Sequence, residues 1–179
     1  FRQRTTLASA QNSRVVIGDQ NYLNFSSNDY LGLASNEKVK AAFQSAVDQY
    51  GVGSGSSHLV SGHSEPHEKL EQQIAAWTGR DRALVFSSGY MANLGVLNAL
   101  LNKHDFVLAD KLNHASLVDA AIASPASVRR FRHKDVNHLD ALLNQSTTHD
   151  GGLGLIVTDS VFSMDGDMAD LPALAKISR

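Results

Sequence analysis

A strand-to-helix junction near residue 88 has the composition of an anion-binding site. The apolar run Ala83–Phe86 is read as a strand, and a helix is expected to begin at Gly89. The free N–H groups at a helix N-terminus, with the helix dipole, bind phosphate or carboxylate groups. Gly89 lets such a group approach the backbone, Ser87 or Ser88 can cap the helix or bind its oxygens, and Tyr90 can lie against a flat ligand. Plain strand–cap–helix punctuation explains the same residues equally well.

Two further segments place polar side chains after expected strands. His114, within Asn113–Ser116, can stack on a ring, donate a hydrogen bond or move a proton, although a solvated loop histidine is the plainer interpretation. The segment 158–167 presents carboxylates and hydroxyls, Asp159 and Ser163 among them. An Asp-Gly turn is the alternative there, and the spacing of the carboxylates matches no calcium loop.

Three other patterns are interpreted without a site. The glycines of 51–55 follow a helix and not a strand, which favours a turned loop over a dinucleotide-binding loop. His63 and His67 lack the glutamate of a zinc protease, and Pro66 would break a helix shared by the two, so no metal site is expected. The basic run Arg129–Lys134 is short and is followed by an acidic residue, which favours a solvated strand end over a nucleic-acid patch.

The elements that must position these residues alternate along the chain. A hairpin is expected at 15–25 around Gly18-Asp19, then a helix over 37–50 capped by Asn36, a loop at 51–57 and a helix from about 66 to 79. Beyond this point we expect strands at 83–86, 106–109, 127–131 and 153–158, with helices at 89–101, 115–123, 136–143 and from 171 onward. Short apolar strands alternating with helices indicate a parallel sheet covered on both faces. Ligands of such sheets bind beyond the carboxyl ends of the strands, here at 87–90, 110–114, 132–135 and 159–166.

Composition excludes several classes of protein. The 179 residues suit one domain or a large part of a bigger one, and 42% hydrophobic with 19% charged residues excludes a disordered tail or a coiled coil. A formal net charge of -2 argues against a nucleic-acid or anionic-membrane partner. The absence of cysteine excludes a disulfide scaffold and a thiol nucleophile, and no apolar run is long enough to span a bilayer. We therefore expect a cytoplasmic α/β protein.

Several motifs in a fixed order are more specific than any one of them. They are NFSSNDYLGL at 24–33, GSGSSHLVSG at 53–62, SGYMAN at 88–93, NHASL at 113–117 and VFSMDGD at 161–167. Together they resemble the α-oxoamine synthases, pyridoxal-phosphate (PLP) enzymes that condense an amino acid with an acyl thioester and release carbon dioxide. The resemblance covers essentially the whole chain. It implies an α/β fold, the fold-type I PLP-dependent transferase fold with its large, mostly parallel-sheet domain.

The segment Ser57–Gly62 points to one branch of that family. Other branches commonly place an arginine near the position of His58, and here none is present. The resemblance is therefore greatest to the biotin-biosynthesis branch, which implies an acyltransferase that uses L-alanine and a pimeloyl thioester of coenzyme A or acyl carrier protein. It also implies a homodimer. The alternatives are a glycine-using branch (glycine C-acetyltransferase or 5-aminolevulinate synthase) and a non-catalytic binding module.

The resemblance also assigns roles to individual residues. Gly89 and Tyr90 match the family's phosphate contact, and His114 matches an imidazole that stacks on the pyridine ring and can reach the substrate carboxylate. Ser163 matches a hydroxyl that contacts the cofactor, and Asp159 stands where the family often has an acidic residue near it.

Two positions near the N-terminus and the domain organisation follow from the same resemblance. Arg2 matches an arginine at the acyl substrate, where a guanidinium can bind a carboxylate bidentately, and Asn28 is a further active-site candidate, contributed across a dimer interface. Residues 1–35 are expected to form an N-terminal arm and small hairpin, and 36–179 the first half of the large PLP-binding domain. No lysine of the chain has the setting of the family's Schiff-base lysine, so we expect a fragment that is inactive alone.

Overall fold

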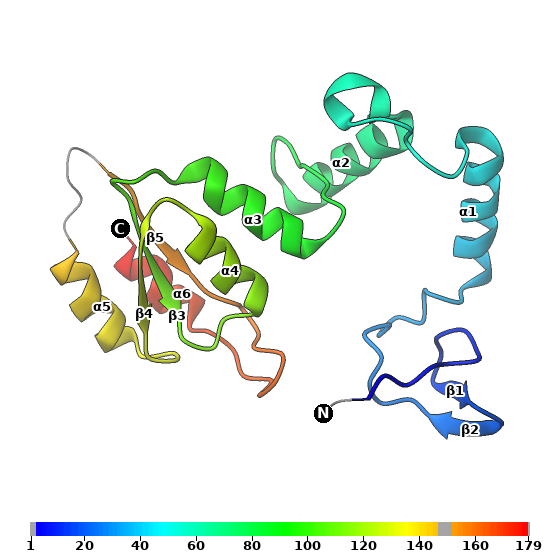
Figure 1. Cartoon of the computed structure of the whole chain (residues 1–179), viewed down its shortest axis with the longest axis horizontal. Coiled ribbons are helices and arrows are strands. Elements are labelled where there is room, and N and C mark those ends of the chain that lie inside the picture. The colour runs from blue at the N-terminus through cyan, green and yellow to red at the C-terminus, as the bar shows by residue number, and fades with distance from the viewer. Residues whose placement is uncertain (1–2, 147–151, 179) are drawn as a thin grey trace. The chain divides into compact units, whose positions relative to one another are not determined.

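The computed structural model describes residues 3–146 and 152–178, which form two compact units (Figure 1). The first unit extends to Glu68 and the second begins at Lys69. The domain boundary expected between residues 35 and 36 remains a prediction about the parent fold.

The first unit contains the expected hairpin and helix. Strands β1 (Arg14–Ile17) and β2 (Gln20–Leu23) pair in antiparallel fashion. Gly18 lies in the turn between them with φ +59°, a conformation that glycine adopts without steric cost. Helix α1 (Glu37–Tyr50) begins where predicted, because the side chain of Asn36 accepts hydrogen bonds from two backbone N–H groups of the first turn.

The segment between α1 and α2 contains an element that the sequence analysis did not anticipate. After a glycine-rich loop, in which Gly51 and Gly55 both have positive φ, a single π-helical turn, η1, spans His58–Gly62. Helix α2 (Glu65–Thr78) follows. The expected turned loop is therefore confirmed, and the π-helical turn is an addition to it.

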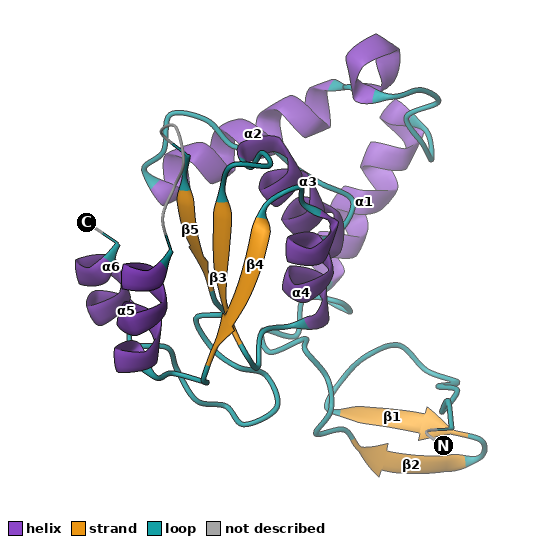
Figure 2. Ribbon diagram, turned by 60° about the vertical axis from the view of Figure 1, so that its left-hand side comes forward, coloured by secondary structure: helices purple, strands orange, loops and turns teal. Residues whose placement is uncertain are grey.

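The second unit is built on a three-stranded parallel sheet. Its strands are β3 (Phe106–Asp110), β4 (Ser127–Phe131) and β5 (Gly154–Val157), in the spatial order β4-β3-β5 (Figure 2). In the register, Val107 pairs with Val128 on one side and with Leu155 on the other. All residues of β3 are buried, as expected for the central strand of a parallel sheet.

Helices cover both faces of this sheet, as predicted. They are α3 (Gly89–Leu100) and α4 (Ala115–Ala123) on one face, and α5 (Val136–Gln145) and α6 (Leu171–Ile177) on the other. Among the helices of the described residues, none is both long and apolar enough to cross a membrane.

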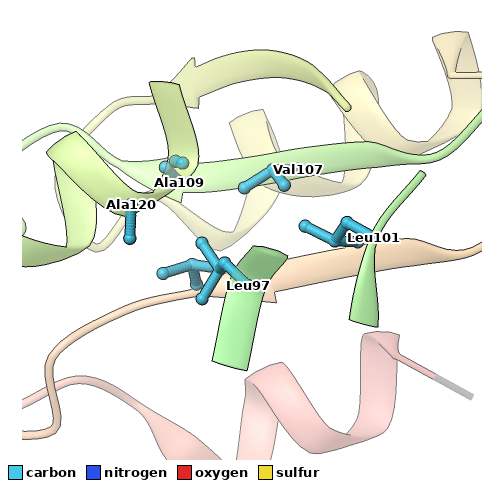
Figure 3. Packing of buried hydrophobic residues seen from close by; sticks show 7 residues of the cluster. Leu97, Leu101, Val107, Ala109 and Ala120 are labelled. Carbon is cyan, nitrogen blue, oxygen red and sulfur yellow. The ribbon is translucent and has the colours of Figure 1, made fainter. Parts of the chain in front are cut away.

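The alternation of side chains along β3 divides the core into two clusters. Val107 and Ala109 pack with Leu97 of α3 and Ala120 of α4 (Figure 3). The intervening residues of β3 point to the opposite face, where Leu108 packs with Leu139 of α5. This period of two fixes which face of β3 each helix pair covers.

The expected strand at Ala83–Phe86 is wrong. This segment is irregular, and among the described residues it pairs with no strand. Leu84 is 78% exposed, and the backbone N–H of Val85 donates to the carboxylate of Glu71 at 2.9 Å. An apolar run becomes a strand only where a neighbouring strand satisfies its backbone groups, and sequence pattern cannot supply that neighbour.

The central strand should carry much of the stability of the second unit. Leu108 is fully buried, so Leu108→Ala should lower the free energy of unfolding by about 2–5 kcal/mol through lost contacts and a residual cavity. Ile122→Ala, at a side chain that is 70% exposed, is the matched control and should change it by no more than about 0.5 kcal/mol. Urea titration measures both, and equal losses would contradict the assigned core.

Candidate functional site

A pocket of about 440 Å³ lies beyond the carboxyl ends of β3 and β5. It is lined by residues 112–115, which join β3 to α4, and by residues 159 and 161–165, which follow β5. The structure thus brings together His114, Asp159 and Ser163, which are far apart in the sequence. It does so at the edge of the sheet where ligands of parallel sheets were expected.

Asn113 fastens the two sides of this pocket to each other. It is buried, its side-chain amide donates to the carbonyl of Val157 at 2.8 Å, and its Oδ1 accepts from the N–H of Asp159 at 3.1 Å. One side chain therefore satisfies both backbone groups where β5 ends. In the sequence Asn113 stands out only as part of the motif at 113–117, although its place after a buried strand was a signal of this role.

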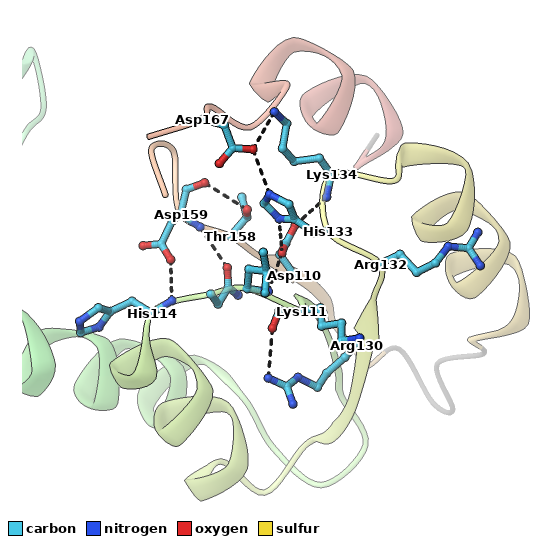
Figure 4. A network of polar contacts seen from close by, with 12 residues as sticks. Asp110, Lys111, His114, Arg130, Arg132, His133, Lys134, Thr158, Asp159 and Asp167 are labelled. Carbon is cyan, nitrogen blue, oxygen red and sulfur yellow. Dashed lines mark hydrogen bonds and ion pairs between the residues drawn. The ribbon is translucent and has the colours of Figure 1, made fainter. Parts of the chain in front are cut away.

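Asp159 places His114 from the other side. Its Oδ2 accepts a hydrogen bond of 2.7 Å from the backbone N–H of His114 (Figure 4). With Asn113 this makes a reciprocal pair of bonds between the loop after β3 and the loop after β5. In this structure the carboxylate of Asp159 therefore fixes the backbone at His114 by a hydrogen bond.

The imidazole of His114 is both a helix cap and an exposed group. Its Nδ1 accepts from the N–H of Ser116 at 3.2 Å and lies 2.7 Å from the hydroxyl of Ser116. That hydroxyl in turn accepts from the amide of Asn93 in α3 at 2.9 Å, so its own proton points to Nδ1. In the neutral ring these contacts leave the proton on Nε2, which makes the outer edge of the imidazole a hydrogen-bond donor.

The N-terminus of α3 has the properties expected of an anion site. The side chain of Ser88 caps the helix by accepting from the N–H of Met91 at 3.2 Å, and the first turn contains no acidic residue. A side chain at Gly89 would meet no atom within 4 Å, so the approach to the backbone is open. The hydroxyl of Tyr90 donates to Asp119 at 2.8 Å, and this bond raises the pKa of Tyr90.

Residues 160–169 form a small hairpin that carries Ser163. Its two legs are joined by the bridge between Val161 and Met168 and by hydrogen bonds from Phe162 N to Asp167 O and from Ala169 N to Ser160 O. Ser163 is exposed and lines the pocket. The position of its hydroxyl therefore depends on how this hairpin is fixed to the sheet.

A polar network around the buried Asp110 could not be predicted from the sequence. His133 lies with Nδ1 2.9 Å from Asp110 Oδ1 and Nε2 3.0 Å from Asp167 Oδ2, and the ammonium of Lys134 lies 2.9 Å from the same oxygen of Asp167. The hydrogen bond to Asp110 is the main cause of a raised pKa of His133. Lys134 and then His133 lower the pKa of Asp167.

The interpretation of 129–134 as a solvated strand end holds for the arginines and fails at His133. Arg129 and Arg130 are exposed as expected. His133 is only partly exposed and lies between the carboxylates of Asp110 and Asp167, whereas Lys134 is exposed and its ammonium pairs with Asp167. The sequence of a basic run does not reveal which distant carboxylates, here Asp110 and Asp167, will lie beside it in the fold. The expected ligand-edge segments 110–114, 132–135 and 159–166 did, however, include most of the network.

The remaining predicted site residues are placed outside this pocket or outside the description. Asn28 is exposed in a turn of the first unit, and Arg2 lies outside the described residues. Among residues 3–146 and 152–178, none of those lining the pocket is a lysine. The roles of Arg2 and Asn28 therefore stay predictions.

Comparison with known proteins decides the family. The model of the family "Aminotransferase class I and II" matches residues 20–179, which is most of the chain. The chain belongs to this family. As a member of the class I and II aminotransferases it has the expected α/β fold with a parallel sheet, so the predicted fold class is confirmed.

Curated relatives confirm the predicted resemblance within this aminotransferase family. The chain is 53% identical, over its whole length, to an 8-amino-7-oxononanoate synthase of Methylococcus capsulatus and 52% identical to one of Pseudomonas syringae pv. syringae. It covers 46% and 44% of these two proteins. The chain thus spans about half the length of the curated relatives it matches.

Two solved structures share the fold of this chain. A serine palmitoyltransferase variant from S. paucimobilis with a bound PLP–myriocin aldimine superposes with a TM-score of 0.92 at 30% identity, over 97% of this chain and 44% of its own. An 8-amino-7-oxononanoate synthase from Francisella tularensis has a TM-score of 0.71 at 36% identity, over 86% of this chain and 42% of its own. The fold is common to both enzymes, whereas the identity is higher to the second.

Asn113 should be more important for stability than an exposed asparagine. Asn113→Ala leaves a buried carbonyl at Val157 and a partly buried N–H at Asp159 without their partner, so the free energy of unfolding should fall by about 1–3 kcal/mol. Asn98→Ala, on the exposed surface of α3, should change the free energy of unfolding by no more than about 0.5 kcal/mol. Denaturant titration of both variants checks this, and an unaffected Asn113→Ala protein would contradict the fastening role.

Proposed function

We propose that the protein carrying this sequence is an 8-amino-7-oxononanoate synthase of biotin biosynthesis. It condenses L-alanine with a pimeloyl thioester, releases carbon dioxide and the free thiol, and uses pyridoxal phosphate. The observation that carries the proposal is the identity of 52–53% to synthases of this name over the whole chain. In this proposal the chain supplies the phosphate side and the ring-stacking side of the cofactor site.

The described residues fit the cofactor. Pyridoxal phosphate has a dianionic phosphate and a flat ring. For the phosphate, the chain offers the backbone N–H groups of Gly89 and Tyr90 in the first turn of α3. For the ring it offers an exposed imidazole at His114 beside a pocket of about 440 Å³. The hydrogen bonds from Asn93 through Ser116 to His114 connect the helix that would hold the phosphate to the residue that would hold the ring.

Each residue then has a task that its contacts support. When bound, pyridoxal phosphate supplies an electron sink for the carbanion formed at the α carbon of the amino acid. His114 would orient the ring by stacking on it, and its Nε2 would donate a hydrogen bond to the carboxylate of alanine. Asp159 and Asn113 hold the backbone of His114. The hydroxyl of Ser163, which lines the pocket, would contact the cofactor from the hairpin.

Two assignments at the substrate end extend the proposal. Arg2 would bind the terminal carboxylate of the pimeloyl chain, because a guanidinium can bind a carboxylate through two hydrogen bonds. Asn28 would contribute to the site across a dimer interface. Both rest on the family resemblance, and the cytoplasmic homodimer expected from it likewise stays a prediction.

Substrate choice tests the proposed function. The PLP-loaded protein should release carbon dioxide fastest with L-alanine and a pimeloyl thioester, offered on coenzyme A and on acyl carrier protein in parallel, and mass spectrometry should identify 8-amino-7-oxononanoate. Glycine with acetyl- or succinyl-coenzyme A and serine with palmitoyl-coenzyme A are the competing pairs. Faster turnover of any competing pair would assign the protein to another branch.

A substitution at His114 distinguishes its role as the N-cap of α4 from the role proposed for its imidazole ring. His114→Asn keeps an N-cap acceptor for α4 but removes the flat ring and the Nε2 donor, so stability should be nearly unchanged. The dissociation constant for pyridoxal phosphate should rise, and kcat/KM with alanine should fall about 100-fold because the cofactor loses its orientation. Equilibrium cofactor titration, steady-state kinetics and a melting curve measure the three effects. Unfolding without a specific loss of cofactor binding would contradict the role.

A further inference from the structure

His133 holds a position unlike that of any other histidine with described contacts in the second unit. Both of its ring nitrogens lie at hydrogen-bond distance from carboxylates, Nδ1 2.9 Å from Asp110 and Nε2 3.0 Å from Asp167. A carboxylate can only accept, and a neutral imidazole has only one proton to donate. The two contacts are therefore satisfied together only by the protonated ring.

The two carboxylates belong to different parts of the fold. Asp110 ends β3 and is 1% exposed; its Oδ1 also accepts from Leu112 N, and its Oδ2 accepts from Lys134 N at 2.9 Å. Asp167 lies on the returning leg of the hairpin 160–169. His133 thus connects the end of the buried central strand to the hairpin 160–169 (Figure 4).

His133 also contacts the outgoing leg of the same hairpin. The ring of Phe162, which is buried, meets the imidazole edge-on with centroids 4.4 Å apart and planes at 88°. Phe162 directly precedes Ser163, and both line the pocket. The imidazole of His133 therefore contacts both legs of the hairpin. It forms an ion pair with Asp167 on one leg and packs against the ring of Phe162 on the other.

The charges around His133 balance only when it is protonated. The groups that face it or share its partners are Asp110 from β3, Asp167 from the hairpin and Lys134 on its own segment. Two carboxylates then face two cations. Asp167 Oδ1 is buried and has no hydrogen-bond partner among the described residues. The negative charge of this carboxylate is therefore stabilised by the contacts of Oδ2 with His133 and Lys134.

We propose that His133 is a positioning residue, which in its protonated form fixes the hairpin 160–169 against β3 and thereby sets the Ser163 hydroxyl in the cofactor pocket. The proposal rests on the proposed function for the role of Ser163, but the fixing of the hairpin does not. Loss of the proton releases one of the two carboxylates. The pocket is then complete only below the pH at which His133 deprotonates.

The direction of the pH effect follows from the raised pKa of His133, which the hydrogen bond to Asp110 causes above the ordinary value of 6.5. A group whose pKa is higher in the folded than in the unfolded state stabilises the folded state, and this stabilisation is complete below the unfolded-state pKa. The stabilisation is lost as pH rises through the folded pKa. Hairpin order and cofactor affinity should therefore decrease together above pH 6.5, on the alkaline side.

The first test measures the protonation of His133 and the stability of the hairpin, without any assay of function. In ¹⁵N spectra of the imidazoles, both nitrogens of His133 should be protonated and should titrate above pH 6.5. Hydrogen exchange should report on the N–H groups of Phe162, Gly166 and Ala169, which are bonded within the hairpin. In His133→Gln these should exchange about tenfold faster or more at pH 6.5, because a neutral amide cannot replace both charged contacts.

Two further variants keep the test decisive. Asp167→Asn removes only the carboxylate of the hairpin leg and should reproduce the faster exchange even if His133→Gln fails to fold. His104→Gln replaces an exposed histidine outside the network and should leave exchange unchanged. A neutral His133 at pH 6.5, or unchanged hairpin exchange in both network variants, would overturn the proposal.

Cofactor titration separates this proposal from the proposed function. In the unsubstituted protein the dissociation constant for pyridoxal phosphate should rise with pH in step with His133 titration, and in His133→Gln it should be weaker and independent of that titration. The effects of His133→Gln and Ser163→Ala should be non-additive, because one acts through the other. Absence of cofactor binding in the whole protein that carries this sequence would refute the proposed function but leave the exchange test unaffected. Additive effects would refute the link to Ser163.

Discussion

The buried carboxylate of Asp110 is the interaction on which the arrangement of the site depends. It ends the central strand β3, where the backbone leaves the sheet, and its oxygens accept from its own turn at Leu112, from the backbone of Lys134 and from His133. A carboxylate that is 1% exposed is tolerated only when its oxygens are satisfied in this way. The loops after β3 and β4 are therefore tied to a single point, and the hairpin after β5 is tied to it through His133.

Asn113 repeats this arrangement one turn further along the chain. It satisfies a carbonyl and an N–H where β5 ends, while Asp159 returns a hydrogen bond to the backbone of His114. These hydrogen bonds fix the backbone that lines the pocket, so that only a few side chains there are free to contact a ligand. His114 and Ser163 are exposed there, as expected for groups that meet a ligand.

This division of tasks explains why similar frames occur in enzymes with different substrates. The solved serine palmitoyltransferase and the 8-amino-7-oxononanoate synthase both superpose on this chain, so the frame does not itself select the substrate. The higher identity to the synthases is the feature that favours alanine and a pimeloyl thioester in our proposal. The cofactor side of the site and the substrate side are separate inferences with separate support.

The sequence by itself determined most of the elements and the edge of the sheet at which the site lies. Helix α4 begins and ends at the predicted residues 115 and 123, and the parallel sheet was expected from its alternating pattern, because periodicity and caps act over a few residues. Only the tertiary structure decided that 83–86 is not a strand and that His133 faces Asp110 and Asp167. Strand pairing and ion pairing join residues distant in sequence, and local composition carries no record of such partners.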